Sequence, residues 1–324
     1  MRYYMAPIEG LTGYIYRNAY HRCFRPMDKY FTPFLSPKQN KGLSLRELND
    51  ILPEHNQGLC VVPQILTNRW EDFTHTALIL KEYGYGEVNL NLGCPSGTVV
   101  SKNKGAGFLA LPQGLEAFLD KVCRELDHMG MELSVKTRLG VANEDEFYRL
   151  MEIYSRYPLK ELIVHPRSRA DYYKNKPRME LFAYAMDASS CPVCYNGDIF
   201  TASAYRRLTQ ACPMLDALML GRGILANPGL KEELEKAGKL DKERFCLFHG
   251  LVYEGYREIM SGDRNVLFKM KELWSMMIQI FNDNGRYIKR IKKAQRLEEY
   301  KAAVDLILRD LDIVAGEGFK PERH

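Results

Sequence analysis

One cysteine of this chain stands in a setting that suits proton transfer. It belongs to the stretch EVNLNLGCPSGTVVSKNKGAG, residues 87–107, in which apolar residues alternate with asparagines up to Leu92. Such alternation predicts a short buried strand. The chain then turns through Gly93, Cys94 and Pro95 into a loop rich in glycine and lysine. The stretch therefore predicts that Cys94 presents its thiol at the end of a strand.

Further polar side chains stand at the ends of this and other apolar runs. These residues are Gln64, Asn91, Lys136, Arg138, His165, Arg167, Asn196 and Asp198, followed by the pair Gly221 and Arg222. A single lysine or histidine at a strand end is more often merely solvated than functional. Here an ammonium, an imidazole, amides and guanidinium groups recur together, and that joint pattern predicts a functional site.

The elements that must position these residues alternate between strands and helices. Eight apolar runs predict strands, at 3–7, 29–31, 61–66, 87–93, 133–137, 161–165, 192–197 and 216–221. Amphipathic segments such as 68–84 and 112–130 lie between them. Alternation of this kind favours parallel pairing through right-handed crossovers. The fold class we expect is a (β/α)8 TIM barrel, whose strand ends share one chemically active face.

The pattern changes near residue 238, after which only helical periodicity remains. We therefore expect a catalytic barrel over 1–238 and a small helical bundle over 239–324. The interval between the first two strands is the least clear part of the barrel.

Composition excludes several classes of protein. Hydrophobic residues make up 46% of the 324-residue chain and charged residues 27%, as in ordinary globular proteins. We find neither the apolar core of a signal peptide nor a membrane span. The eight cysteines are scattered, so we expect a reducing, cytoplasmic location. The net charge of +5 permits a polyanionic partner without demanding one.

Glycines after the last two strands predict a phosphate site. The run Gly221-x-Gly223-x-x-Ala226 matches a dinucleotide fingerprint only weakly, because no acidic second strand follows. The phosphate site of a barrel, to which Gly197 would add amides, fits better than a plain glycine turn. Lys136 suits the negative charge of a reduced flavin, so FMN fits better than a sugar phosphate.

No metal site is expected. The CPVC segment, 191–194, begins a strand and has no second ligand pair with zinc spacing. The histidines show no ligand spacing either. In the tail, the segment 286–296 predicts a helix with one basic face. Its members are Lys289, Lys292, Lys293 and Arg296, and they matter only if the substrate is a nucleic acid.

Together these motifs resemble the tRNA-dihydrouridine synthase family. APIEGLTG (6–13) is similar to the family's opening, and NLNLGCPSGTVVSKNKGAGFLAL to its Gly-Cys-Pro signature. SVKTRLG, VHPRSR, NGDI and LMLGRGILANP then follow in the family's order. The resemblance covers residues 5–230. In the tail it rests only on the family's habit of carrying a helical RNA-binding domain there.

The resemblance implies an FMN-dependent oxidoreductase that reduces uridine to 5,6-dihydrouridine in tRNA, with NADPH or NADH as reductant. It implies hydride transfer from FMN N5 to C6 of the base and proton transfer from Cys94 to C5. The implied FMN contacts are Pro7, Ile8, Glu9, Gln64, Lys136, His165, Asn196, Gly197, Asp198, Gly221 and Arg222. Cysteine is mostly protonated at neutral pH, as an acid must be. Lys102 or Lys104 would lower its pKa if close.

The substrate base must leave its stack to reach a flavin inside a barrel. Asn91, Arg138 and Arg167 are candidate contacts to the extruded nucleotide. The basic tail helix would hold the body of the tRNA, or of another structured RNA. We expect a monomer without membrane or metal partners.

Two positions depart from the family pattern, and two other functions stay open. Gly13 stands where an Asp is usual, and Pro166 replaces a Gly in the His-Gly-Arg block. A different FMN barrel acting on a free pyrimidine metabolite would explain the rim but not the tail. A non-catalytic RNA-binding barrel would leave the intact Gly-Cys-Pro turn unexplained.

Overall fold

The strands form one sheet that closes into a barrel. The computed structural model describes residues 1–37 and 42–321. Its strands are β1 (Arg2–Met5), β2 (Lys29–Phe31), β3 (Val61–Val62), β4 (Gln64–Ile65), β5 (Glu87–Leu92), β6 (Glu132–Arg138), β7 (Glu161–His165), β8 (Val193–Tyr195) and β9 (Ala217–Leu220). They are ordered β3-β2-β1-β9-β8-β7-β6-β5-β4.

Pro63 explains why nine strands stand where eight are predicted. It divides one predicted strand into β3 and β4, and proline cannot donate to a ladder. β3 pairs in parallel with β2, and β4 pairs in parallel with β5. The divided strand therefore joins the two edges of the sheet, and the predicted eight-stranded barrel is confirmed.

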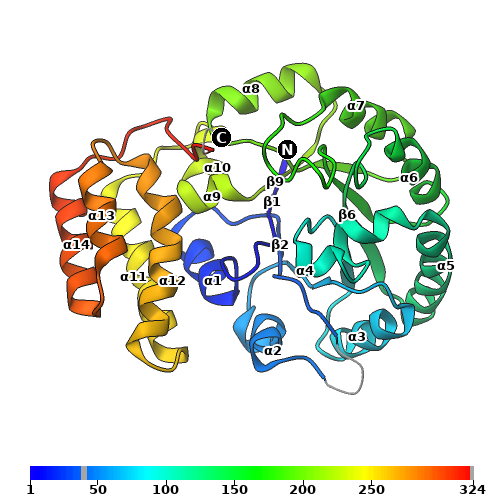
Figure 1. Cartoon of the computed structure of the whole chain (residues 1–324), viewed down its shortest axis with the longest axis horizontal. Coiled ribbons are helices and arrows are strands. Elements are labelled where there is room, and N and C mark those ends of the chain that lie inside the picture. Colours follow the sequence, from blue (N-terminus) through cyan, green and yellow to red (C-terminus); the bar gives the residue numbers. More distant parts are fainter. Residues whose placement is uncertain (38–41, 322–324) are drawn as a thin grey trace. The chain divides into compact units, whose positions relative to one another are not determined.

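Helices follow the strands as the periodicity predicts. They are α1 (Tyr14–Cys23), α2 (Leu45–Ile51), α3 (Trp70–Glu82), α4 (Gly97–Val100), α5 (Pro112–Met129), α6 (Glu146–Tyr154), α7 (Met179–Ala188), α8 (Ala202–Ala211), α9 (Arg222–Ala226) and α10 (Leu230–Leu234). α1 occupies the interval that the sequence left least clear. Along the outside of the sheet α3 packs on α5, α5 on α6, and α6 on α7 (Figure 1).

The barrel interior is unusually polar near β5, β6 and β7. Successive residues of a strand point to opposite sides, so every second residue faces inward. On β6 the inward residues are Ser134, Lys136 and Arg138, and the register places Lys136 between Asn91 and Ile163. Apolar residues fill the rest of the interior: Tyr4, Ala6, Phe31, Val62, Ile163, Cys194, Ala217 and Met219.

The amino ends of the strands are held by a buried ionic network. Tyr4 Oη donates to Glu161 Oε1 at 2.7 Å, and Lys29 Nζ lies 2.7 Å from Glu87 Oε2. Lys29 also lies 3.6 Å from the second Glu161 oxygen. This network is remote from the polar strand ends, so we assign it to stability.

The chain separates into two compact units. One contains residues 1–14, 28–197 and 212–219, and the other contains 15–27, 198–211 and 220–324, described to residue 321. The second unit carries the tail helices α11 (Lys242–Ile259), α12 (Asp263–Met277), α13 (Gly285–Lys293) and α14 (Leu297–Asp310). A helical tail is thus confirmed, and a functional boundary at residue 238 stays a prediction.

A polar triad lies inside the tail bundle. Trp274 Nε1 donates to Tyr300 Oη at 2.8 Å and to His249 Nε2 at 3.2 Å, and the His249 and Tyr300 atoms are 2.6 Å apart. The triad joins α11, α12 and α14. No helix within residues 1–37 and 42–321 is long and apolar enough to cross a bilayer.

Candidate active site

The backbone around Cys94 is fixed from three directions. Asn91 Oδ1 accepts hydrogen bonds from the amides of Gly93 and Cys94, each at 3.0 Å. Arg138 Nε donates to the Gly93 carbonyl at 2.8 Å. The Cys94 carbonyl accepts from the Ala106 amide at 3.0 Å. The turn that the sequence predicts therefore holds the backbone of Cys94 in a fixed position.

Burial raises the pKa of the Cys94 thiol above its ordinary value. Arg138 and Lys136 are the cations that oppose this shift, and their effect is smaller than that of burial. These two, rather than Lys102 or Lys104, are therefore the cations that act on the thiol. The thiol keeps its proton at neutral pH, which is the state that a general acid requires.

Lys136 places an unpaired ammonium inside the barrel. Its side chain is half-buried, and no hydrogen-bond acceptor or ion-pair partner for Nζ exists among residues 1–37 and 42–321. Burial, reinforced by the neighbouring Arg138, lowers the pKa of Lys136 to about 8. A desolvated cation without an internal partner is costly, so this arrangement indicates a site for an anionic group.

Gln64 belongs to an amide network on the barrel wall. Gln64 Nε2 donates to Asn89 Oδ1 at 2.7 Å, and Gln64 Oε1 accepts from Asn91 Nδ2 at 2.7 Å. Asn89 Nδ2 in turn donates to Ser134 Oγ at 3.0 Å. Asn89 and Ser134 were not among the predicted site residues, although the inward period of two from Asn91 to Asn89 was a signal in the sequence.

Arg138 is deeply buried and holds backbone. It is 1% exposed, and its Nη1 donates to the carbonyls of Ser168 at 3.0 Å and Tyr172 at 2.9 Å. With the bond to Gly93, Arg138 ties the loop after β7 to the Cys94 turn. Its direct contact with substrate stays a prediction.

His165 and Arg167 form a second linked pair. Arg167 Nη1 lies 3.0 Å from His165 Nε2, and Arg167 Nε donates to the Asn175 carbonyl at 2.6 Å. A guanidinium has no acceptor, so Nε2 of His165 must accept and Nδ1 must carry the ring proton. The histidine is thereby fixed as an Nδ1–H donor.

The APIEGLTG segment, residues 6–13, contributes to the barrel interior through Ile8. Ile8 packs against the apolar interior cluster, and its amide donates to Thr12 Oγ1 at 2.8 Å. Glu9, which follows Pro7 and Ile8, forms an ion pair with Arg46. Burial nevertheless raises the pKa of Glu9.

The carboxylate of Asp50 lies beside Gly13. Its Oδ1 accepts from the Tyr14 amide at 2.6 Å and would lie 3.2 Å from a β-carbon on Gly13. Asp50 therefore caps the start of α1 from α2. Pro166, the other departure, retains its carbonyl as an acceptor for the Arg178 amide at 2.8 Å.

The residues of the predicted phosphate site fall in both units. Asn196 and Gly197 belong to the first, where Asn196 Nδ2 donates to the Met219 carbonyl at 2.9 Å. A β-carbon on Gly197 would lie 2.1 Å from Tyr195 Oη, so packing also requires this glycine. In the second unit, Arg222 Nη2 donates to Asp198 Oδ1 at 2.8 Å, and Gly221 precedes α9.

The basic tail segment is only partly one helical face. α13 ends at Lys293, and its Lys289, Lys292 and Lys293 are exposed, without an ion pair to any described residue. The expected continuation of the face to Arg296 is wrong. Arg296 lies at the N-cap of α14, and its Nε is 3.4 Å from Glu299 Oε1.

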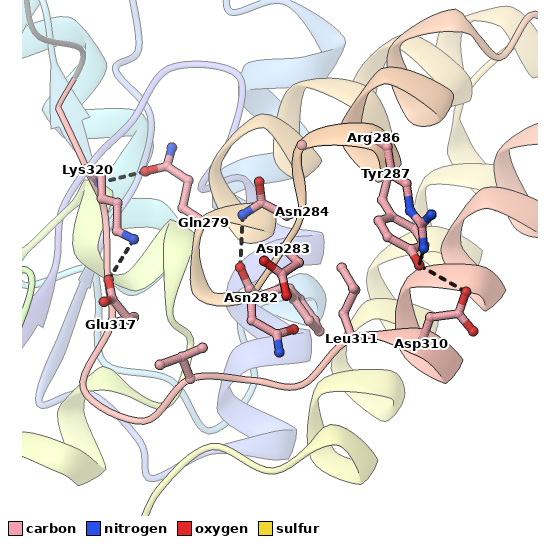
Figure 2. Close-up of a pocket in the computed structure, with 13 residues that line it drawn as sticks. Gln279, Asn282, Asp283, Asn284, Arg286, Tyr287, Asp310, Leu311, Glu317 and Lys320 are labelled. Atoms are coloured by element: carbon pink, nitrogen blue, oxygen red, sulfur yellow. Dashed lines mark hydrogen bonds and ion pairs between the residues drawn. The ribbon is translucent and has the colours of Figure 1, made fainter.

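A polar pocket of about 860 Å³ opens on the tail, next to α13 (Figure 2). Tyr287 Oη accepts from Arg286 and donates to Asp310 Oδ2 at 3.1 Å. Lys320 pairs with Glu317 at 2.8 Å. Lys320 is thus paired with a carboxylate, and Arg286 is hydrogen-bonded to a tyrosine hydroxyl. The pocket contains none of the predicted site residues.

The two cysteines of the CPVC segment are not members of the amide network on the barrel wall. Cys194 is fully buried in the apolar interior, and Cys191 is partly buried. Within the part of the chain that the structure describes, no group of three or more His, Cys, Asp or Glu residues could hold a metal ion.

A family model and two relatives show which known sequences this chain is similar to. A family model described as dihydrouridine synthase matches residues 4–311. A probable tRNA-dihydrouridine synthase of Staphylococcus aureus (strain COL) is 27% identical over 69% of this chain and 68% of its own. A tRNA-dihydrouridine(16) synthase of Pseudomonas putida is 29% identical over 73% of this chain and 74% of its own.

Solved structures share the barrel at low sequence identity. Morphinone reductase in complex with tetrahydroNAD is 13% identical with a TM-score of 0.51, over 75% of this chain and 90% of its own. Histamine dehydrogenase from Rhizobium sp. 4-9 is 13% identical with a TM-score of 0.56, over 84% of this chain and 49% of its own. At these identities the likeness shows the fold alone.

Proposed function

The chain belongs to the dihydrouridine synthase family and is therefore a flavin-dependent oxidoreductase; we propose that it reduces uridine in tRNA, that FMN is its flavin and that NADPH or NADH is its reductant. The observation that carries the proposal is the half-buried Lys136, whose ammonium has no partner among the described residues. It offers a fixed positive charge to an anionic group inside the barrel.

The residues near Lys136 fit a flavin in chemical type. Ile8 offers an apolar surface, and His165 offers an Nδ1–H donor. FMN, when bound, supplies the hydride for C6 of the base. Lys136 would stabilise the negative charge of the reduced ring. The remaining proposed cofactor contacts are Pro7, Glu9, Gln64, Asn196, Gly197, Asp198, Gly221 and Arg222.

Cys94 is the proposed donor of the proton to C5. Its raised pKa keeps the proton on sulfur until the base accepts it. Asn91 and Arg138 hold the turn, so the thiol direction does not depend on substrate. Preformed geometry of this kind lowers the entropic cost of the transfer.

The tail is the proposed contact to the body of the tRNA. Lys289, Lys292 and Lys293 are exposed cations with no ion pair to a described residue, and such groups bind phosphates. The target base must be extruded to reach Cys94. The name of the Pseudomonas putida relative does not fix the target position in this chain. We propose that the protein acts as a monomer and that it acts in the cytoplasm.

The test is a visible spectrum of the purified protein, followed by anaerobic addition of unmodified tRNA to the reduced sample. We expect flavin bands that bleach on reduction and return with tRNA, together with dihydrouridine in the digested RNA. Reoxidation by a free pyrimidine but not by tRNA would favour the metabolite enzyme. Absence of flavin after FMN is supplied would overturn the catalytic proposal.

A further inference from the structure

The loop after β7 carries an exposed aromatic and basic surface, which we call the Tyr172 lip and define as residues 169–176. Tyr172 is 38% exposed in this loop. Lys174 and Lys176 are exposed and form no ion pair with a described residue. Cations thus surround an aromatic ring on one short segment.

The lip is held rigidly by one carboxylate. Asp171 Oδ2 accepts from the Ser168 amide at 2.7 Å and from Arg178 Nη1 at 2.6 Å, and Asn175 Nδ2 donates to Oδ1. These bonds lower the pKa of Asp171 despite its burial, so the carboxylate stays charged. The loop is therefore preorganised, and ordering it on binding costs little.

Tyr172 adopts a backbone conformation that is unfavourable for a tyrosine. Its φ is +50°, in the left-handed region that a bulky residue seldom occupies. Such strain persists only where the surroundings impose it, and it concentrates at ligand clamps. More than a third of the Tyr172 surface is in solvent, so part of the side chain can contact a ligand.

Arg169 completes the aromatic surface. Its guanidinium carbon lies 5.1 Å from the centre of the Tyr172 ring, and its Nη2 donates to Tyr172 Oη at 3.0 Å. Its Nε is buried without a hydrogen-bond partner in the described chain. The pair therefore combines a fixed ring with a partly exposed guanidinium.

Arg138 links the lip to the catalytic thiol. It donates to the Tyr172 carbonyl at 2.9 Å and to the Gly93 carbonyl at 2.8 Å. One side chain therefore spans the distance between the lip and the residue before Cys94. A polymer with one unit at Cys94 would pass its neighbouring units over this lip.

We propose that Tyr172 stacks on a nucleotide adjacent to the target uridine, while Lys174 and Lys176 contact the phosphates of that strand. Residues 169–178 contain four cationic side chains and one acidic side chain, so their charge complements RNA. Exposed aromatics interleaved with cations are the usual platform for single-stranded nucleic acid. The inference rests on the proposed function and specifies how the lip contacts its RNA.

The test compares Tyr172→Gly with Tyr172→Phe in steady-state reduction of unmodified tRNA. Glycine accepts a positive φ freely, so Tyr172→Gly removes the ring and relieves the strain. We expect its KM for tRNA to rise by about 5- to 150-fold, because one stacked base contributes about 1–3 kcal/mol to binding. We expect kcat, the flavin spectrum and the melting temperature to hold. Tyr172→Phe should keep the wild-type KM.

A salt titration tests the two lysines. Lys174→Gln with Lys176→Gln should flatten the dependence of tRNA affinity on salt concentration. Lys121→Gln, an exposed lysine on α5, is the matched control and should leave it unchanged. Equal slopes in the lysine pair and the control would contradict the phosphate contacts.

The two proposals fail differently. If the wild-type protein forms no dihydrouridine, the proposed function is wrong. If it forms dihydrouridine and Tyr172→Gly keeps the wild-type KM, the stacking inference is wrong. Tyr172→Asn, which also tolerates a positive φ, supplies the same comparison should the glycine variant fold poorly. A KM that rises equally in Tyr172→Phe would also overturn stacking.

Discussion

Arg138 donates from Nε to the carbonyl oxygen of Gly93 at 2.8 Å, so a guanidinium on β6 holds the turn that carries Cys94. The same side chain binds the carbonyls of Ser168 and Tyr172. Arg138 therefore acts as a positioning residue for the thiol, whatever further contact it makes with substrate.

Replacement of Arg138 by lysine should impair the thiol's position while keeping a positive charge. Lysine cannot reproduce three donors in a planar fork. We expect kcat to fall by about 10- to 100-fold, since a small misplacement of a reacting group costs that much. Flavin binding should persist. The check is steady-state kinetics, with Arg124→Lys on the exposed surface of α5 as control. A kcat equal to that of the control variant would contradict the positioning role.

Gly105 should be required for the position of Cys94. Its φ is +55°, and a β-carbon there would lie 2.9 Å from the Cys94 carbonyl oxygen and 3.0 Å from Cys94 Cβ. Gly58 also has a positive φ, at +76°, but open space around it. We expect both alanine variants to lose about 1–3 kcal/mol of unfolding free energy.

Only Gly105→Ala should also lower kcat, because only its β-carbon meets Cys94. The measurements are chemical denaturation and tRNA reduction for both variants. Equal kcat in the two would show that the contact with Cys94 has no effect on the reaction.

Lys136→Met should shift the potential of the bound flavin to more negative values. Loss of the cation destabilises the negatively charged reduced ring. A charged contact of about 1.5–3 kcal/mol corresponds to about 30–60 mV for two electrons. Spectroelectrochemical titration measures this shift, and Lys136→Arg, which keeps the charge, should recover part of it. An unchanged potential in Lys136→Met would place the flavin away from this residue.

His249 should make the protein less stable in mild acid. Burial lowers the pKa of His249 to about 4 in the folded protein, against about 6.5 in the unfolded chain. The unfolded chain therefore binds the extra proton first as the pH falls. The stability contributed by the neutral ring is complete above pH 6.5 and is lost between about pH 6.5 and 4, at up to about 1.4 kcal/mol per pH unit.

The measurement is denaturant unfolding between pH 4.5 and 7.5, in the range given by these pKa values. His249→Gln should be less stable at neutral pH and should show a shallower pH slope. The exposed His75→Gln should match the wild type in both respects. A wild-type slope in His249→Gln would assign the acid sensitivity to other groups.

The sequence predicts the barrel because its signal is local. Alternation in 87–93 and the helical period in 112–130 are visible without knowing the neighbours, and β5 and α5 follow them closely. The end of α13 was predicted less well, since the apolar period continues through Ala294 and Leu297 while the helix stops at Lys293.

The site was predicted by residue type but not by partner. Nothing in the sequence tells that Arg138 binds three backbone carbonyls or that the Asp50 carboxylate binds the amide next to Gly13. Both depend on contacts between residues at least 30 positions apart in the sequence. Lys136 differs, because its position near the end of the strand predicted over 133–137 was visible in the sequence.

The central claim is that Cys94 delivers the proton to the substrate base. The most direct measurement is the rate at which pre-reduced Cys94→Ala flavoprotein is reoxidised by unmodified tRNA in a single anaerobic turnover. We predict a rate at least about 100-fold below the wild type, with the rate of reduction by NADPH and the affinity for tRNA unchanged. Reoxidation at the wild-type rate, with dihydrouridine as the product, would contradict the assignment.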